Sequence, residues 1–76
     1  MIIKYKLQWE SADKKSKQFV GDIIDESENK QFCYYMNING TWITDYILLY
    51  EKKTFKDITY TEIGKEIINI IKKQEK

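Results

Sequence analysis

The chain has 76 residues, a third of them charged, and a formal net charge of only +1. A chain of this length has room for one domain with one modest core, so we expect a single small domain over residues 1–76. Every basic residue is a lysine, and the missing arginine is the side chain that usually binds guanine edges and phosphates in a bidentate manner. A dedicated reader of duplex DNA is therefore disfavoured.

The residue types also restrict the chemistry. Histidine is absent and Cys33 is the single cysteine, which removes the usual general base, the Ser–His and Cys–His pairs and most zinc sites. We therefore expect a protein that is not an enzyme and that has no cofactor and no metal site. In the middle of a strand, Cys33 is more typical of a small buried hydrophobe than of a nucleophile.

Sequence features also indicate where the protein acts. A lone cysteine is typical of a reducing compartment. The first residues contain no long apolar run, so the sequence predicts neither a signal peptide nor a membrane span. We expect a cytoplasmic protein, either bacterial or, if phage-encoded, acting in the cytoplasm of the host.

Residues 1–9 alternate between apolar and polar side chains, which predicts a half-buried strand. The expected core side comprises Ile3, Tyr5, Leu7 and Trp9, and the opposite side comprises Lys4, Lys6 and Gln8. Residues 18–26 are ambiguous, because their apolar residues also match a helical stripe. Phe19-Val20 and Ile23-Ile24 favour a strand, and Gly21 would cost a helix interior about 1 kcal/mol. We favour a strand; a helix would change the element order from ββββα to βαββα.

The stretch from Lys30 to Tyr50 consists of two strand-forming runs joined by Asn39-Gly40. Asn-Gly predicts a type I′ turn, which needs positive φ at both central residues. The predicted pairs are then Met36–Ile43, Tyr34–Asp45 and Phe32–Ile47. One face carries Phe32, Met36, Ile43 and Ile47 and is aliphatic in the main, and the other carries Tyr35, Trp42, Tyr46 and Tyr50 and is aromatic. Asp45 falls on the aliphatic face, where the Tyr34 hydroxyl or a lysine is expected to satisfy it.

The last part of the chain predicts an amphipathic helix over residues 60–74. Thr59 is the expected N-cap, because Glu62 three residues later completes a capping box, and Ile58 can pack on Ile63 as a hydrophobic staple. Apolar residues recur at helical spacing on one side, at Tyr60, Ile63, Ile67, Ile70 and Ile71. Residues 51–57, before the helix, are interpreted as a polar connector anchored by Phe55.

Together these elements predict an α+β fold. We expect an antiparallel β-meander of about four strands around the central hairpin 31–50, with the C-terminal helix packed on its aliphatic face. That arrangement leaves an aromatic face, whose candidate partner-binding residues are Tyr35, Trp42, Tyr46, Tyr50, Lys4 and Lys6. Two other interpretations stay open: the aromatic face is the core of a strongly curled sheet, or it is the seam of a homodimer.

The function that these features favour is stoichiometric binding to another protein through the aromatic face. Inhibitors of host defence encoded by phages or mobile elements, immunity proteins and antitoxins are proteins of this kind. The alternative is a single-stranded nucleic-acid binder that stacks bases on Tyr35, Trp42 and Tyr46 while Lys4 and Lys6 follow the backbone. The near-zero net charge and the missing arginine favour the protein partner.

Overall fold

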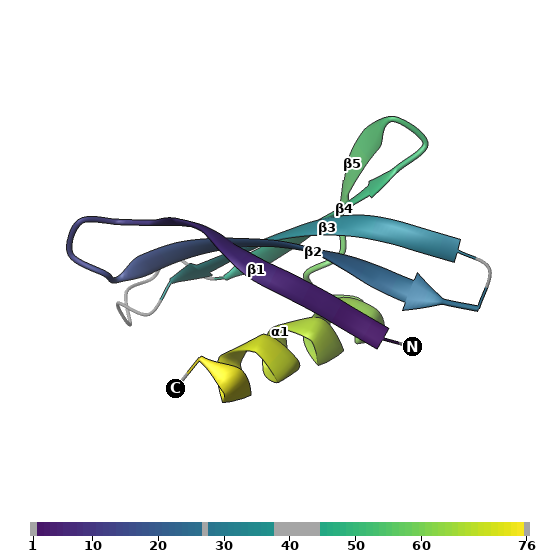
Figure 1. Ribbon diagram of the computed structural model, residues 1–76. Coiled ribbons are helices and arrows are strands. Elements are labelled where there is room, and N and C mark those ends of the chain that lie inside the picture. The colour runs from purple at the N-terminus through teal and green to yellow at the C-terminus, as the bar shows by residue number, and fades with distance from the viewer. Residues whose placement is uncertain (1, 27, 38–44, 76) are drawn as a thin grey trace.

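Five strands followed by one helix make up the part of the chain that the computed structural model describes, which is residues 2–26, 28–37 and 45–75. The elements are β1 (Ile2–Glu10), β2 (Ser16–Asp25), β3 (Glu28–Asn37), β4 (Tyr46–Glu51), β5 (Thr54–Asp57) and α1 (Glu62–Gln74). The strands form one antiparallel sheet in chain order, and α1 lies across one side of it (Figure 1). The α+β meander with a C-terminal helix is therefore confirmed, with one strand more than expected.

Residues 18–25 belong to β2 and Glu26 to the turn that follows it, so the alternative order βαββα is wrong. Phe19 and Ile23 are buried and Gly21, between them, pairs with Phe32 on β3. A Cβ at Gly21 would lie 2.1 Å from the Lys4 carbonyl oxygen and 2.8 Å from the Phe32 ring. Glycine at this position therefore leaves the space in which the Phe32 ring folds over β2.

The segment after β4 forms a further strand, β5, and is not the polar connector that the sequence predicts for residues 51–57. Glu51 pairs with Thr54, and Lys52 and Lys53 between them have φ angles of 52° and 65°. Positive φ at both central residues is typical of a type I′ turn, for which asparagine and glycine are the preferred residues. A Lys-Lys pair carries no such signal, and this is why the sequence did not predict β5.

β3 and β4 pair in a register that differs from the predicted one. Phe32 lies opposite Leu49 and Tyr34 opposite Ile47, so the predicted pairs Phe32–Ile47 and Tyr34–Asp45 are wrong by two residues. The described residues of β3 and β4 keep their predicted faces, because strand side chains alternate and a shift of two positions returns each one to the same side. Residues 38–44, which include the predicted Asn39-Gly40 turn, lie outside the described residues.

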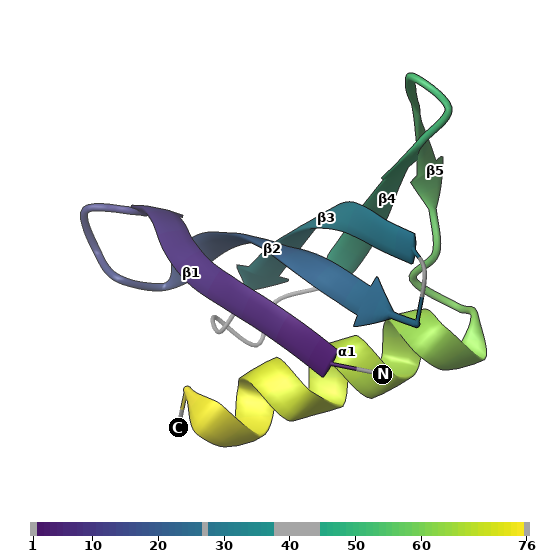
Figure 2. The ribbon, with the colours of Figure 1, turned by 45° about the vertical axis from the view of Figure 1, so that its right-hand side comes forward.

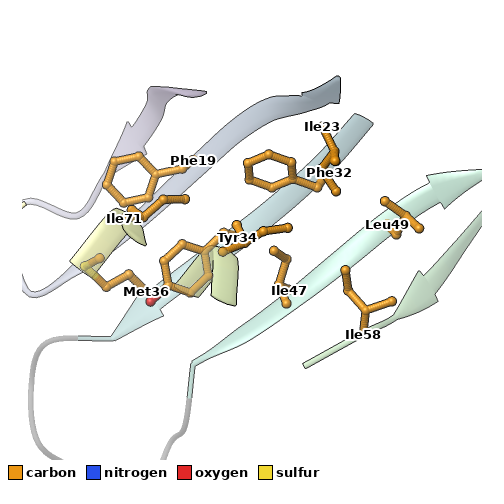
Figure 3. Packing of buried hydrophobic residues seen from close by; sticks show 10 residues of the cluster. Phe19, Ile23, Phe32, Tyr34, Met36, Ile47, Leu49, Ile58 and Ile71 are labelled. Carbon is orange, nitrogen blue, oxygen red and sulfur yellow. The ribbon is translucent and has the colours of Figure 1, made fainter. Parts of the chain in front are cut away.

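The core lies between α1 and the side of the sheet that faces it. Its buried side chains are Phe19, Ile23, Phe32, Tyr34, Met36, Ile47, Leu49, Ile58, Ile67 and Ile71. Figure 3 shows how those from β2, β3 and β4 gather on one side of the sheet. The Phe19 ring stacks on Tyr34 with centroids 6.0 Å apart and meets the edge of Tyr5 at 5.5 Å. The helix thus covers the predicted aliphatic face.

Asp45 has both of the partners expected for it. Its Oδ2 accepts a hydrogen bond from the Tyr34 hydroxyl at 2.8 Å and lies 2.6 Å from the Lys72 ammonium of α1. The side chain is only 10% exposed, so without these partners the carboxylate would be costly to bury. Burial, together with the hydrogen bond to Asp45, raises the pKa of Tyr34 well above its ordinary value. This contact ties the C-terminal half of α1 to the sheet.

The helix begins two residues later than its sequence signal indicates. Thr61 is the N-cap, and its Oγ1 accepts a hydrogen bond from the Gly64 amide at 3.1 Å. The predicted N-cap Thr59 is wrong because the chain is still held along β4 at this point, with the Ile58 amide donating to the Ile47 carbonyl at 3.0 Å. Thr59 is itself buried, and its hydroxyl accepts from the Ile47 amide and donates to Asp57.

Candidate functional site

The side of the sheet away from α1, here called the open face, is hollowed. The strand register places residues of all five strands on it, and the hollow has a volume of about 1020 Å³. Figure 2 shows the cause: the hairpin of β4 and β5 rises away from α1, whereas β1 and β2 run lower, so the sheet curves around this face. The side chains that line the hollow include Lys4, Lys6, Gln8, Gln18, Val20, Asp22, Gln31, Cys33, Tyr35, Leu48, Tyr50 and Phe55.

Aromatic rings occur in cross-strand pairs on the open face. Tyr35 and Tyr46 lie opposite each other on β3 and β4, and their rings stack with centroids 4.5 Å apart. Tyr50 and Phe55 lie opposite each other on β4 and β5, with their rings tilted by 54° and their centroids 5.1 Å apart. These rings keep much of their surface in solvent: Tyr46 is 41% exposed, Tyr50 39% and Phe55 65%. The open face therefore presents aromatic surface that folding has not buried.

A β-bulge adds Trp9 to this face. The register of β1 shifts between Leu7 and Trp9, so that Trp9 lies opposite Gln18. Directly opposite residues point to the same side of a sheet, and Gln18 lines the hollow. The expectation that Trp9 is a core residue is therefore wrong, because a bulge inserts one residue and reverses the alternation beyond it. Trp9 is 52% exposed, and Leu7, also predicted for the core, is exposed as well.

Polar side chains on the open face form a small network around Cys33. The Gln18 side-chain amide donates to the Cys33 sulfur at 3.0 Å and to the Gln8 side-chain oxygen at 3.4 Å. A hydrogen bond with Cys33, together with partial burial, raises the pKa of the Tyr35 hydroxyl. Cys33 is half-buried, so it is less buried than expected, and it lies between Val20 and Leu48 on the neighbouring strands.

Lysines on β1 give one border of the hollow its charge. Lys4 and Lys6 are exposed. Within residues 2–26, 28–37 and 45–75, ion pairs join Lys17 to Glu10, Lys30 to Glu28 and Glu51, and Lys72 to Asp45, and none involves Lys4 or Lys6. The two lysines thus form no close ion pair within the described part of the fold, and Asp22 on β2 is the carboxylate opposite Lys4 in the register.

The structure brings most of the predicted site residues together. Lys4, Lys6, Tyr35 and Tyr50 line the same hollow, and Tyr46 stacks on Tyr35. Trp42 lies outside the described residues. The sequence interpretation missed Trp9 and Phe55. The sequence has no turn signal at Lys52 and Lys53, so it does not predict the strand that carries Phe55. It has no signal for the bulge either, so strict alternation places Trp9 on the wrong face.

A metal centre and a membrane-spanning helix are both absent from the described residues. No group of three or more histidine, cysteine, aspartate or glutamate side chains in them is placed to hold a metal ion. No helix in the same part of the chain is long and apolar enough to cross a membrane. Comparison with protein-family models, with curated proteins and with solved structures finds no match for this chain. Its function therefore has to be inferred from its own geometry.

Proposed function

We propose that this protein acts without catalysis, by stoichiometric binding of another protein to its open face. The observation that carries the proposal is the exposed aromatic surface of that face, which remains after α1 has covered the opposite side of the sheet. Within this class, an inhibitor of a host defence system encoded by a phage or mobile element, an immunity protein or an antitoxin fits a small cytoplasmic chain of this kind.

The residue types of the open face support a protein partner. Tyrosine and tryptophan are enriched at the centres of protein interfaces, because each offers a large apolar area together with a polar tip. Tyr46, Tyr50 and Trp9 present both in solvent. The face is also concave, so a protruding segment of a partner can bury these rings from more than one direction. Such contacts are the ones that typically dominate binding energy in an alanine scan.

Charge argues against nucleic acid as the main ligand. Binding to phosphates draws its affinity from the release of counterions by several cationic groups. The chain has a net charge of +1 and no arginine, and Asp22 lies among the residues that line the hollow. The open face therefore offers aromatic contact area with little cationic charge.

A single-stranded nucleic acid is the second candidate, and one observation favours it. Lys4 and Lys6, which have no ion-pair partner among the described residues, line the same hollow as Tyr35 and Tyr50. Base stacking on an aromatic side chain is worth about 1–3 kcal/mol per base. Binding to oligo-dT or poly-U that weakens steeply with salt would support this candidate, and no binding at low salt would end it.

An affinity capture with matched variants tests the proposal. The bait is the full chain, compared with Tyr46→Ala and Tyr50→Ala on the open face and with Tyr60→Ala as a control. Tyr60 is 78% exposed and precedes α1, and it is not among the residues that line the hollow. We expect a protein that survives nuclease treatment, that binds the wild type and the control, and that is lost with both open-face variants.

Three other outcomes would contradict the proposal. A captured species that disappears with nuclease would mean that the open face binds nucleic acid and not a protein. Recovery of the chain alone, with a doubled mass in sedimentation, would make the face a homodimer seam. A partner that is retained by Tyr46→Ala and Tyr50→Ala would show that it binds elsewhere.

A further inference from the structure

The outer edge of β1 is a second surface that the fold leaves open. β1 is the first strand in the sheet order and, among the described strands, pairs with β2 alone. It has nine residues, whereas the strand at the opposite edge, β5, has four. Along an edge strand, alternate backbone N–H and C=O groups point outwards without a ladder partner, and a long edge is a template for a further strand.

The side chains of this edge alternate in character. Lys4 and Lys6 point to the open face and are exposed, and neither has an ion-pair partner among the described residues. Ile3 and Tyr5 point to the other side and pack against the core, and Leu7 follows them there with 47% of its surface exposed. The Tyr5 hydroxyl donates to Gln74 at 2.6 Å and to Glu75 at 3.3 Å, so the end of α1 lies beside this side of β1. An incoming strand would thus meet cations on one side and, on the other, Ile3 and Leu7 with the polar end of α1 between them.

A second copy of β1 is a poor occupant of this edge. Two copies that continue one antiparallel sheet are related by a two-fold axis perpendicular to the sheet. Each side chain then lies opposite a side chain of the same face only if the axis lies beside a residue and not between two residues. Centred on Tyr5, Lys4 lies opposite Lys6 of the second copy; centred on Lys4 or Lys6, that lysine lies opposite its own equivalent. Like charges directly opposite each other destabilise a strand pair, so the lysines act against self-association in these three registers. A register centred on Leu7 would place Lys4 opposite Glu10, but it would have to pair through the bulge; one centred on Ile3 would pair little more than Ile2 to Lys4.

We infer that this edge receives an extended acidic segment of the protein partner, which pairs with β1 as an additional strand. Carboxylates at alternate positions would lie opposite Lys4 and Lys6. The side chain between them would lie opposite Tyr5, and those on either side would cover Ile3 and Leu7. This mode of recognition takes its affinity from main-chain hydrogen bonds and its selectivity from alternate side chains. It rests on the proposed function in one respect, that the partner is a protein.

The bulge sets the far limit of the site. Regular pairing of β1 extends from Ile2 to Leu7, and the register shifts before Trp9. The Trp9 side chain lies on the open face with half of its surface in solvent. A segment that follows β1 would pass this ring as it leaves the edge, so the strand site and the aromatic hollow adjoin each other at Trp9 and along the lysines.

Synthetic peptides test the inference without knowledge of the natural partner. The probe is a peptide of alternating valine and glutamate, with two matched controls: the same peptide with lysine in place of glutamate, and the glutamate peptide with N-methyl groups on alternate amides. The N-methylated control keeps the charges and removes the backbone donors along one edge of the peptide, which is the edge that would face β1. Binding is followed on the full, isotope-labelled chain by amide chemical shifts and by hydrogen exchange of β1.

We expect the glutamate peptide to slow the exchange of β1 amides and to bind at least about tenfold more tightly than either control. The double variant Lys4→Glu/Lys6→Glu should reverse the preference and select the lysine peptide. Both substitutions are at exposed positions, and an unchanged amide spectrum in the absence of peptide would establish that the variant folds.

Equal binding of the N-methylated peptide would reduce the edge to a charged surface and overturn the inference. Shifts confined to Tyr46 and Tyr50, a dimer of the free chain in sedimentation, or a preference for a single-stranded oligonucleotide over the glutamate peptide would do the same. The proposed function can fail separately. If Tyr46→Ala and Tyr50→Ala retain the partner while β1 still pairs with the peptide, the partner does not bind to the open face, but the inference of strand addition to β1 is kept.

Discussion

The two sides of the sheet are similarly rich in large apolar residues, yet they end in different environments. On the side of α1, Tyr34 and Phe19 are completely buried. On the open face, Tyr46 and Tyr50 of β4 remain about two-fifths exposed. A single helix can cover only one side of a sheet, and the residues that the structure describes contain no second helix for the other side. The contrast separates side chains that hold the fold together from side chains that are available for a partner.

The largest expected effect is at the centre of the helix. Ile67→Ala removes a completely buried side chain and should lower the free energy of unfolding by about 2–5 kcal/mol, because lost burial and a cavity add together. Urea denaturation measures the change. Ile2→Ala is the matched control, since Ile2 is exposed on β1, and it should change stability by no more than about 0.5 kcal/mol. Similar values for the two variants would mean that α1 is not docked on the sheet as described.

The next effect sharpens how α1 is seated. Replacing glycine by alanine inside a helix normally stabilises it by about 1 kcal/mol. Here a Cβ on Gly64 would lie 1.8 Å from the Ile58 carbonyl oxygen, so Gly64→Ala should instead destabilise the protein by about 1–3 kcal/mol. Asn69→Ala, at an exposed position of the same helix, provides the control and should be neutral or slightly stabilising. A more stable Gly64→Ala protein would rule out the close contact between the start of α1 and Ile58.

The open face should behave differently. Tyr46→Ala removes a ring that stacks on Tyr35 at the surface, and an aromatic pair of this kind is worth about 0.5–1.5 kcal/mol beyond its area. We expect thermal unfolding to stay cooperative with a loss of stability of that order. A loss as large as that of Ile67→Ala would make the open face a part of the core.

The smallest effect concerns pH. Hydrogen bonds from the Thr59 hydroxyl and amide lower the pKa of Asp57, so the folded state favours the carboxylate. This stabilisation is complete above the unfolded pKa of about 3.9 and is lost as the pH falls through the folded value. Asp57→Asn should therefore lose stability near neutral pH and approach the wild type in acid. A difference between the two proteins that is constant from neutral to acidic pH would contradict this linkage.

Local patterns were sufficient to predict which face most side chains occupy. The alternation of Phe32, Tyr34 and Met36 with Cys33 and Tyr35 depends only on the two-residue period of a strand. For that reason the predicted faces are correct although the predicted register of β3 and β4 is wrong by two residues. The same period brought Tyr35, Tyr46 and Tyr50 to one face together with Lys4 and Lys6, and this is most of the candidate site.

The errors occur where backbone geometry departs from those regular patterns. The bulge after Leu7 turns Trp9 to the open face, and nothing in the apolar alternation of β1 indicates an inserted residue. The turn at Lys52 and Lys53 lacks asparagine and glycine although both residues have positive φ. The bulge adds the Trp9 ring to the candidate site and the turn adds the Phe55 ring. The sequence predicted neither residue for that site.

By itself, the sequence determined the class of the fold, the apolar stripe of the helix and the division of the sheet into an aliphatic and an aromatic side, because these follow from local periodicity. Only the tertiary structure decided where α1 begins, how β4 pairs and whether Trp9 belongs to the core. Each of those outcomes depends on contacts between segments far apart in the chain, such as the Ile58 amide held by the Ile47 carbonyl. A local pattern carries no information about a partner that is supplied by the fold.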